Sequence, residues 1–416
     1  MTDTRNVFAL ILAVMILQIA GGLLSMLTPL GLEALGTAPQ FIGGIAALYA
    51  TGFMLGAWTA PAALASFGNI RLFAAAAAVT SAGSIALSLW YEPGFWAIVR
   101  IVQGVSFAYM FTSVESWLGQ AVPDKSRGNV MGLYHMGAKL SLMIGPFFVA
   151  GLSPLDSRAY SWAALFLTLA LVPICLTQQE QPEAPDRKAM PIGRLYKLAP
   201  AAVIGVMLAG VINTGTLALL PIYFESFSSG GGGTAAAATA LAAAWLGGFI
   251  IQWPAGRLSD RIERRLVIAV LCGISGMAAM VIAIFGRSLG EVGVMMVLVV
   301  WGAGALTFFG LCVAHAIDRT PKGKIPQVMS GLLFIWAGGS IVGPLLSGIA
   351  MRGAGATGLF GLSGLLLILL ALIMVWRVSA RAAPEEHQQE DWSPILPTPL
   401  ASVELDPRNP DREAET

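Results

Sequence analysis

Long apolar stretches alternate with short polar breaks along nearly the whole chain. A helix needs about 20 mostly apolar residues to cross the hydrocarbon core of a membrane. The breaks carry Pro, Gly or clustered charge, as in Pro123-Asp124-Lys125-Ser126-Arg127, and such residues commonly end helices. The pattern therefore predicts twelve transmembrane helices, near residues 7–28, 41–63, 72–90, 95–119, 129–150, 159–177, 200–223, 236–255, 266–286, 291–316, 327–350 and 357–377.

Composition supports an all-α membrane protein. Of the 416 residues, 56% are hydrophobic and 11% are charged, whereas an average soluble protein carries about 25% charged residues. The formal net charge of +1 lacks the basic excess of a nucleic-acid binder, so we expect no nucleic-acid partner. The three cysteines lie inside apolar stretches, which favours buried side chains over disulfides.

The distribution of Lys and Arg predicts the orientation. With the N-terminus in the cytoplasm, 19 cations fall in cytoplasmic segments and 3 in outer loops, namely Arg158, Arg287 and Arg352. Cytoplasmic loops of membrane proteins carry such an excess. We therefore expect a multi-pass protein, in a bacterial inner membrane, with both termini in the cytoplasm.

The two halves of the chain share a pattern. Pro29 recurs as Pro221, Pro61 as Pro254, Gly104 as Gly302 and Gly145-Pro146 as Gly343-Pro344, at offsets of 192 to 198 residues. The repeat predicts two six-helix bundles, 1–177 and 200–377, joined by a cytoplasmic linker, 178–199, and followed by a disordered acidic, Pro-rich tail, 378–416. Two similar bundles that rock about a shared site can give alternating access, which favours a transporter.

Three motifs resemble those of the major facilitator superfamily, and the resemblance covers nearly all of residues 5–380. Residues 256–265, G-R-L-S-D-R-I-E-R-R, fit the family's loop signature G-x-x-x-D-[RK]-x-x-[RK]-[RK], while the matching first-half loop keeps only Arg71. Arg100-x-x-Gln103-Gly104 is similar to the family's R-x-x-Q-G. The segment around Gly145-Pro146 partly resembles the antiporter signature, with Val149 and Ala150 in place of its closing glycines.

The resemblance implies roles for these residues. It implies the family's fold of twelve helices in two bundles related by a pseudo-two-fold repeat, and it links Arg100 to proton movement. It also implies that Gly145-Pro146 and Gly343-Pro344 bend their helices. The cytoplasmic gate would be formed by Gly256, Asp260, Arg261, Arg264, Arg265 and Arg71.

Four ionisable residues lie well inside predicted spans, all in the fourth and fifth: Arg100, Glu115, His135 and Lys139. A charge at membrane depth costs at least about 2.5–3.5 kcal/mol, so it points to function. Their repeat partners are apolar, namely Leu298, Val313, Leu333 and Ala337. In one interpretation Glu115 titrates during transport, His135 shares its proton, and Lys139 or Arg100 attracts an anionic solute. In the other, Glu115 and Lys139 form an ion pair that locks two helices.

Uncharged polar residues are further candidates for solute binding. They are Gln18 and Ser25 in the first span and Asn213, Thr214 and Thr216 in the seventh, with Trp301 as an apolar wall. The family builds its central cavity largely from spans one, four, seven and ten, so the resemblance implies that these residues face a site. In contrast, we expect His315 and Asp318, at the end of the tenth span, to be solvated charges of the inner face.

The sequence contains no phosphate-binding P-loop and no hydrolase or metalloprotease motif. We therefore expect neither an enzyme nor a cofactor or metal, and an ion gradient as the energy source. The prediction is a monomeric, proton-coupled secondary transporter of a small organic, possibly anionic, solute. Proton/drug antiport in the efflux direction is the alternative. A more remote alternative is a non-transporting sensor or assembly factor on the same scaffold.

Overall fold

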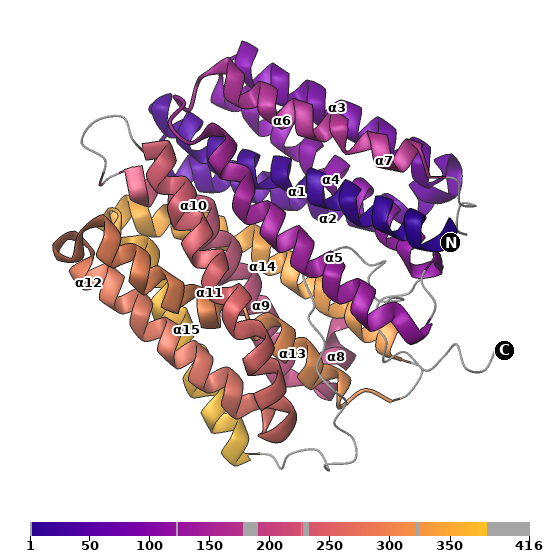
Figure 1. Cartoon of the computed structure of the whole chain (residues 1–416). Coiled ribbons are helices and arrows are strands. Elements are labelled where there is room, and N and C mark those ends of the chain that lie inside the picture. The colour runs from indigo at the N-terminus through magenta and orange to yellow at the C-terminus, as the bar shows by residue number, and fades with distance from the viewer. Residues whose placement is uncertain are drawn as a thin grey trace. The chain divides into compact units, whose positions relative to one another are not determined.

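The computed structural model describes residues 2–121, 124–177, 190–225, 227, 233–321 and 324–380. Every regular element in these ranges is a helix (Figure 1), which confirms the predicted all-α class. Residues 381–416 of the predicted tail and 178–189 of the predicted linker lie outside the described residues.

The described chain divides into two compact units, residues 2–37 with 48–177 and residues 38–47 with 190–380. The first unit holds α1 (Thr2–Ala34), most of α2 (Pro39–Phe67), α3 (Asn69–Leu89), α4 (Pro93–Ala121), α5 (Asp124–Ile144), the 3₁₀ helix η1 (Gly145–Val149), α6 (Ser157–Leu169) and α7 (Leu171–Cys175). The beginning of α2 groups with the second unit.

The second unit begins with the short helix α8 (Ile192–Leu198). The seventh predicted span is formed by α9 (Pro200–Ala209), the π-helical turn η2 (Gly210–Thr214) and α10 (Gly215–Glu225). The remaining helices are α11 (Gly233–Arg261), α12 (Arg264–Ala305), α13 (Phe308–Ile317), α14 (Ile325–Ala354) and α15 (Thr357–Ala380).

Ten helical stretches of the described chain are long and apolar enough to span a membrane. One of them, 264–317, contains both the ninth and the tenth predicted span. The helix α12 folds back on itself at Gly290, whose φ of 66° suits a glycine. Ser275 Oγ hydrogen-bonds with Val300 O and with Gly304 N across the two arms of this hairpin. The fifth predicted span corresponds to α5 and η1, and α5 carries His135 and Lys139.

The two Gly-Pro pairs adopt different structures. At Gly145-Pro146 the α-helix ends and η1 begins. At Pro344 the helix α14 continues without a break. Proline removes a backbone donor in both places, and the predicted bend remains a prediction at each.

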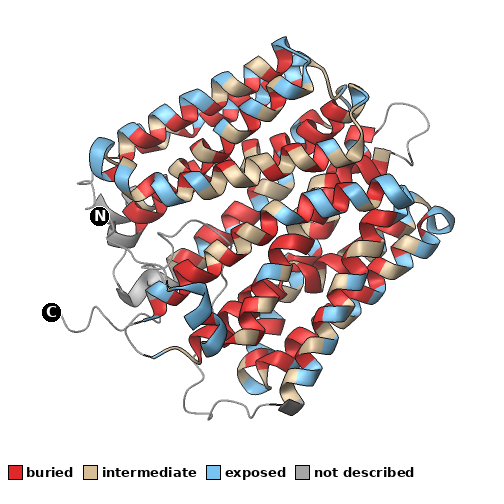
Figure 2. Cartoon of the chain, turned by 180° about the vertical axis from the view of Figure 1, so that it is seen from behind, coloured by how far each residue is buried: buried red, intermediate tan, exposed pale blue. Residues whose placement is uncertain are grey.

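Each unit is held together by a close helix crossing at a repeated glycine. A Cβ added at Gly104 would collide with the carbonyl oxygen of Tyr49, and one at Gly302 with that of Ala244. Small residues allow helix backbones to approach closely in membranes. Figure 2 shows buried positions along one side of many helices and exposed positions along the other. The exposed residues of α15 include Leu365, Leu372 and Trp376, as expected of a surface that faces lipid.

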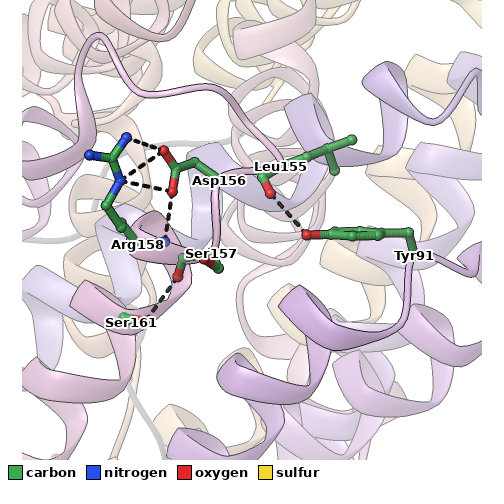
Figure 3. Close-up of polar contacts among 6 residues, drawn as sticks. All are labelled: Tyr91, Leu155, Asp156, Ser157, Arg158 and Ser161. Carbon is green, nitrogen blue, oxygen red and sulfur yellow. Dashed lines mark hydrogen bonds and ion pairs between the residues drawn. The ribbon is translucent and has the colours of Figure 1, made fainter.

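The α6 helix has a polar N-terminal cap outside the apolar spans (Figure 3). Asp156 Oδ1 accepts a hydrogen bond from the Arg158 backbone N–H at 2.8 Å, and the carboxylate also forms an ion pair with the Arg158 guanidinium at 2.6 Å. The hydrogen bonds from the Arg158 side chain lower the pKa of Asp156. Tyr91 Oη donates to Leu155 O at 3.0 Å and attaches the same loop to the beginning of α4.

Candidate functional site

Glu115 and Tyr134 join α4 and α5 inside the first unit. Glu115 is 0% exposed, and its Oε1 accepts a hydrogen bond from Tyr134 Oη at 2.9 Å. Sequence reasoning placed His135 beside this carboxylate and missed Tyr134. In the sequence, only the position of Tyr134 next to His135 pointed to it. The apolar pattern does not give the rotation of a helix about its axis, so it could not show which of the two side chains meets Glu115.

His135 and Lys139 lie one turn apart on α5, and both are buried. The rings of Tyr134 and His135 meet edge to face with centroids 5.0 Å apart. Among the described residues, His135 Nδ1 has no hydrogen-bond partner. The structure therefore brings a carboxylate, a phenol and an imidazole together, with an ammonium group one turn further along α5.

Arg100 belongs to a separate cluster, since it precedes Glu115 by fifteen residues on the same helix, or about 22 Å at the helical rise. Its Nη1 donates to Gln103 Oε1 at 2.9 Å, and its guanidinium carbon lies 4.2 Å from the centroid of the Tyr49 ring. Gln103 Nε2 in turn donates to Ser84 Oγ of α3 at 3.3 Å. These contacts hold the arginine of the R-x-x-Q-G motif against α2 and connect α4 to α3.

The second unit carries no charge at the matching positions. Leu298 and Val313, the repeat partners of Arg100 and Glu115, are buried apolar residues. The partner of Tyr134 at the same offset is Leu332, which is also buried. A carboxylate site of this kind is therefore a feature of the first unit.

The polar residues predicted in the seventh span lie in or next to the π-helical turn η2. Thr214 Oγ1 donates to Gly210 O at 2.5 Å and lies 3.3 Å from Ser340 O of α14. Within the described chain, Asn213 Oδ1 is buried without a hydrogen-bond partner, whereas Thr216 lies in the core. Single π-helical turns often occur at functional sites.

Three other residues predicted to bind solute are Gln18, Ser25 and Trp301. Ser25 is exposed and its hydroxyl donates to Gly22 O of its own helix at 2.7 Å, while Gln18 is half-buried. Trp301 is fully buried, and its Nε1 donates to Ser363 Oγ of α15 at 3.0 Å. This burial and this hydrogen bond indicate that Trp301 packs α12 against α15.

The loop motif of the second unit forms a buried ion-pair network. Arg264, the first residue of α12, contacts Asp318 Oδ2 through Nε at 2.7 Å and Asp260 Oδ1 through Nη1 at 3.1 Å. Asp318 is buried, so the expectation that it is a solvated charge is wrong. The reason is that Arg264 reaches it from the neighbouring helix and replaces its water. His315, one turn earlier, is buried as well, which corrects the same expectation for that residue.

The remaining members of the motif differ in exposure. Arg265 is buried, pairs with Glu263 and donates to Arg377 O of α15 at 2.5 Å. Gly256 is buried within α11, and Arg261 is exposed.

In the first unit, Arg71 is exposed and an amide takes the place of the ion pairs. Asn69 is buried at the beginning of α3, and its Nδ2 donates to Ser113 O of α4 at 2.7 Å. The first-unit loop therefore has an uncharged connection to α4, which the sequence motif did not reveal.

This geometry defines a multi-pass helical membrane protein with a repeated framework, buried charges on α4 and α5 of the first unit and an ion-pair network around Arg264 in the second. Residues 10–330 match the family model described as Major Facilitator Superfamily, which covers more than half of the chain. The chain belongs to this superfamily, as its motifs predicted. It is therefore a transporter of the membrane rather than an enzyme.

Relatives and solved structures agree with this membership. The chain is 24% identical to an uncharacterized MFS-type transporter of Enterobacter sp. (strain 638), over 93% of this chain and 99% of that protein. It is 24% identical to the uncharacterized MFS-type transporter YcaD of Salmonella enteritidis PT4, over 84% and 90%. Its fold is similar to the nucleoside transporter NupG, with a TM-score of 0.72 at 11% identity over 89% and 98% of the two chains. A bacterial homologue of the human lysosomal transporter Spinster gives a TM-score of 0.72 at 16% identity over 94% and 98%.

Proposed function

We propose that the chain is a proton-coupled secondary transporter that moves a small organic solute across the bacterial inner membrane by alternating access. Glu115 is the group that gains and loses the proton in this proposal. The observation that carries it is a fully buried carboxylate that receives a hydrogen bond from Tyr134 inside a predicted membrane span. Such groups commonly mark proton pathways in transporters.

The surroundings of Glu115 support a reversible proton transfer. A hydrogen bond from a phenol favours the charged carboxylate, whereas burial favours the neutral acid. A change in the packing of α4 against α5 would alter the balance between these two effects. His135, whose ring packs edge to face against that of Tyr134, is the proposed second proton carrier.

Lys139 or Arg100 is the proposed contact for an anionic group of the solute. Arg100 is already held by Gln103 and Tyr49, so it would act as a fixed positive charge. Lys139 is buried next to the proton site and would couple solute binding to protonation. In the second unit, Asn213 and Thr214 of the π-helical turn are the proposed uncharged contacts.

The test uses the purified full-length chain in vesicles that contain a pH-sensitive dye, with an imposed pH gradient. A panel of organic carboxylates and of cationic drugs is added outside, and the internal pH is followed. A fall in internal pH when a carboxylate is added supports uptake by symport. A rise in internal pH when a drug is added supports antiport. Glu115→Gln should abolish the response, while the exposed control Glu92→Gln should retain it.

Two results would contradict the proposal. One is a Glu115→Gln protein that carries protons at the wild-type rate. The other is a wild-type protein that moves no protons with any member of the panel, which would favour a sensor on the transporter scaffold. Folding of each variant is checked by its Tm in detergent, so that loss of coupling is separated from loss of structure.

A further inference from the structure

One face of α11 changes from apolar to aromatic to cationic toward the end of the helix. Exposed residues follow one another at helical spacing in the order Leu246, Ile250, Trp253, Arg257 and Arg261. Residues three or four apart lie on the same side of a helix, so these five form one continuous stripe. We refer to them as the α11 stripe.

The aromatic and cationic parts of the stripe are in contact. The guanidinium carbon of Arg257 lies 3.6 Å from the centroid of the Trp253 ring. Trp253 is 57% exposed, so this contact lies on the surface rather than in the core. Stacking on the indole face fixes the plane of the guanidinium and leaves its N–H edge free to donate.

The cations of the α11 stripe form no ion pair within the described chain. Of the four arginines in the loop motif 256–265, Arg264 and Arg265 are buried and pair with acidic side chains. Across the described ranges, the structure shows no ion pair for Arg257 or Arg261, and both are exposed. The surface therefore presents two guanidinium groups that are not held in ion pairs, about 6 Å apart along the helix axis.

We propose that the α11 stripe binds the headgroup of an anionic phospholipid. The phosphate would accept hydrogen bonds from Arg257 and Arg261, because guanidinium groups match phosphate oxygens in a bidentate geometry. Trp253 would lie at the level of the membrane interface, where tryptophan is enriched. The acyl chains would follow Ile250 and Leu246 toward the membrane interior. The positive-inside prediction places this end of α11 on the cytoplasmic side, where basic surfaces recognise anionic lipids.

The proposal is tested on the full-length chain in neutral detergent. Phosphatidylglycerol and phosphatidylcholine with identical acyl chains are titrated in, and native mass spectrometry measures the bound lipid while thermal unfolding measures the Tm. Phosphatidylglycerol should remain bound and raise the Tm more than phosphatidylcholine. Its affinity should fall about fivefold for each of Arg257→Gln and Arg261→Gln, in line with the contribution of one basic residue near an anionic surface.

The controls separate the α11 stripe from general charge effects. Arg71→Gln removes an exposed cation of the first unit and should leave lipid binding unchanged. Trp253→Leu keeps the apolar surface but removes the stacking contact, and should weaken binding. Inorganic phosphate at the same concentration should not replace the lipid.

Three outcomes would overturn the proposal: equal binding of the two lipids, wild-type binding by the Arg257→Gln/Arg261→Gln double variant, or an equal Tm increase with inorganic phosphate alone. Each variant changes only exposed side chains, so its Tm in detergent without lipid should match the wild type.

Discussion

The two units carry their buried charges at different places, one within its helices and the other at the end of a helix. The first unit buries Glu115, His135 and Lys139 on α4 and α5, and the loop before α3 connects to α4 through the uncharged Asn69. The second unit is apolar at the repeat positions, and it concentrates ion pairs around Arg264 at the beginning of α12. The close glycine crossings are common to both.

This contrast separates what the scaffold needs from what has been added to it. The crossings at Gly104 and Gly302 occur in both units, so they belong to the shared architecture. The charges at the positions of Arg100, Glu115 and Lys139 are replaced by apolar residues at the repeat positions of the second unit, so folding of a six-helix bundle does not require them. Charge that the scaffold does not need is the better candidate for function.

A large effect is expected when the carboxylate is placed in the second unit. Val313→Glu puts an acid at the repeat position of Glu115, where Leu332 replaces the donor Tyr134. The variant should lose about 3 kcal/mol of stability, seen as a large drop in Tm and in the yield of monodisperse protein. The double variant Val313→Glu/Leu332→Tyr should recover part of the loss. A fully stable single variant would show that the second unit tolerates the charge.

A second large effect is expected when the ion-pair network around Arg264 is opened. Arg264→Gln removes the guanidinium that pairs with the buried carboxylate of Asp318, and removal of one partner from a buried pair costs about 3–5 kcal/mol. The Tm in detergent should fall strongly, whereas the exposed control Arg352→Gln should change it little. An unchanged Tm for Arg264→Gln would mean that the network contributes nothing to stability.

The hydrogen bond of Asn69 in the first unit should contribute less to stability than the ion pairs of Arg264. Asn69→Ala removes one hydrogen bond to Ser113 O, which is worth about 1 kcal/mol. We therefore expect a Tm decrease clearly smaller than for Arg264→Gln, with the exposed Ser66→Ala as control. Equal decreases for the two variants would remove the distinction between the charged and uncharged loops.

The smallest effect concerns pH and the cap of α6. Because Arg158 lowers the pKa of Asp156 in the folded chain, the ionised cap contributes its full stabilisation above the unfolded pKa of about 4. That stabilisation should be lost as the pH falls through the lower, folded pKa. Asp156→Asn should therefore lower the Tm slightly at pH 7 and approach the wild type in acid. A constant difference between the two proteins across this range would contradict the cap's role.

Much of the fold could be predicted from the sequence because membrane crossing imposes a length and an apolar composition on each helix. The pattern did not show that Gly290 is enough to reverse α12, since only the backbone conformation of that residue distinguishes a turn from a continuous helix. It also placed the beginning of the fifth span at 129, whereas α5 begins at Asp124. Helices continue past the membrane boundary into charged residues, and hydropathy does not record this extension.

The sequence predicts where the ionisable residues of the candidate site lie, but it does not predict which side chains they contact. An ionisable residue in an apolar stretch is visible in the sequence, and Glu115 and Lys139 are both buried in the structure. Their neighbours depend on the rotation and crossing of helices, which is why Tyr134 was missed. The role of Asp318 was missed for the same reason, because its partner Arg264 comes from another helix.

The fold-back at Gly290 also has a consequence for the assembly of the protein in the membrane. The two arms of α12 are separated by a single non-helical residue and are cross-linked by the hydrogen bonds of Ser275. The first arm can form its contacts with the second only when both are in the bilayer. We therefore expect the ninth and tenth predicted spans to complete their insertion together as one hairpin, with little exposed loop for a protease to cleave.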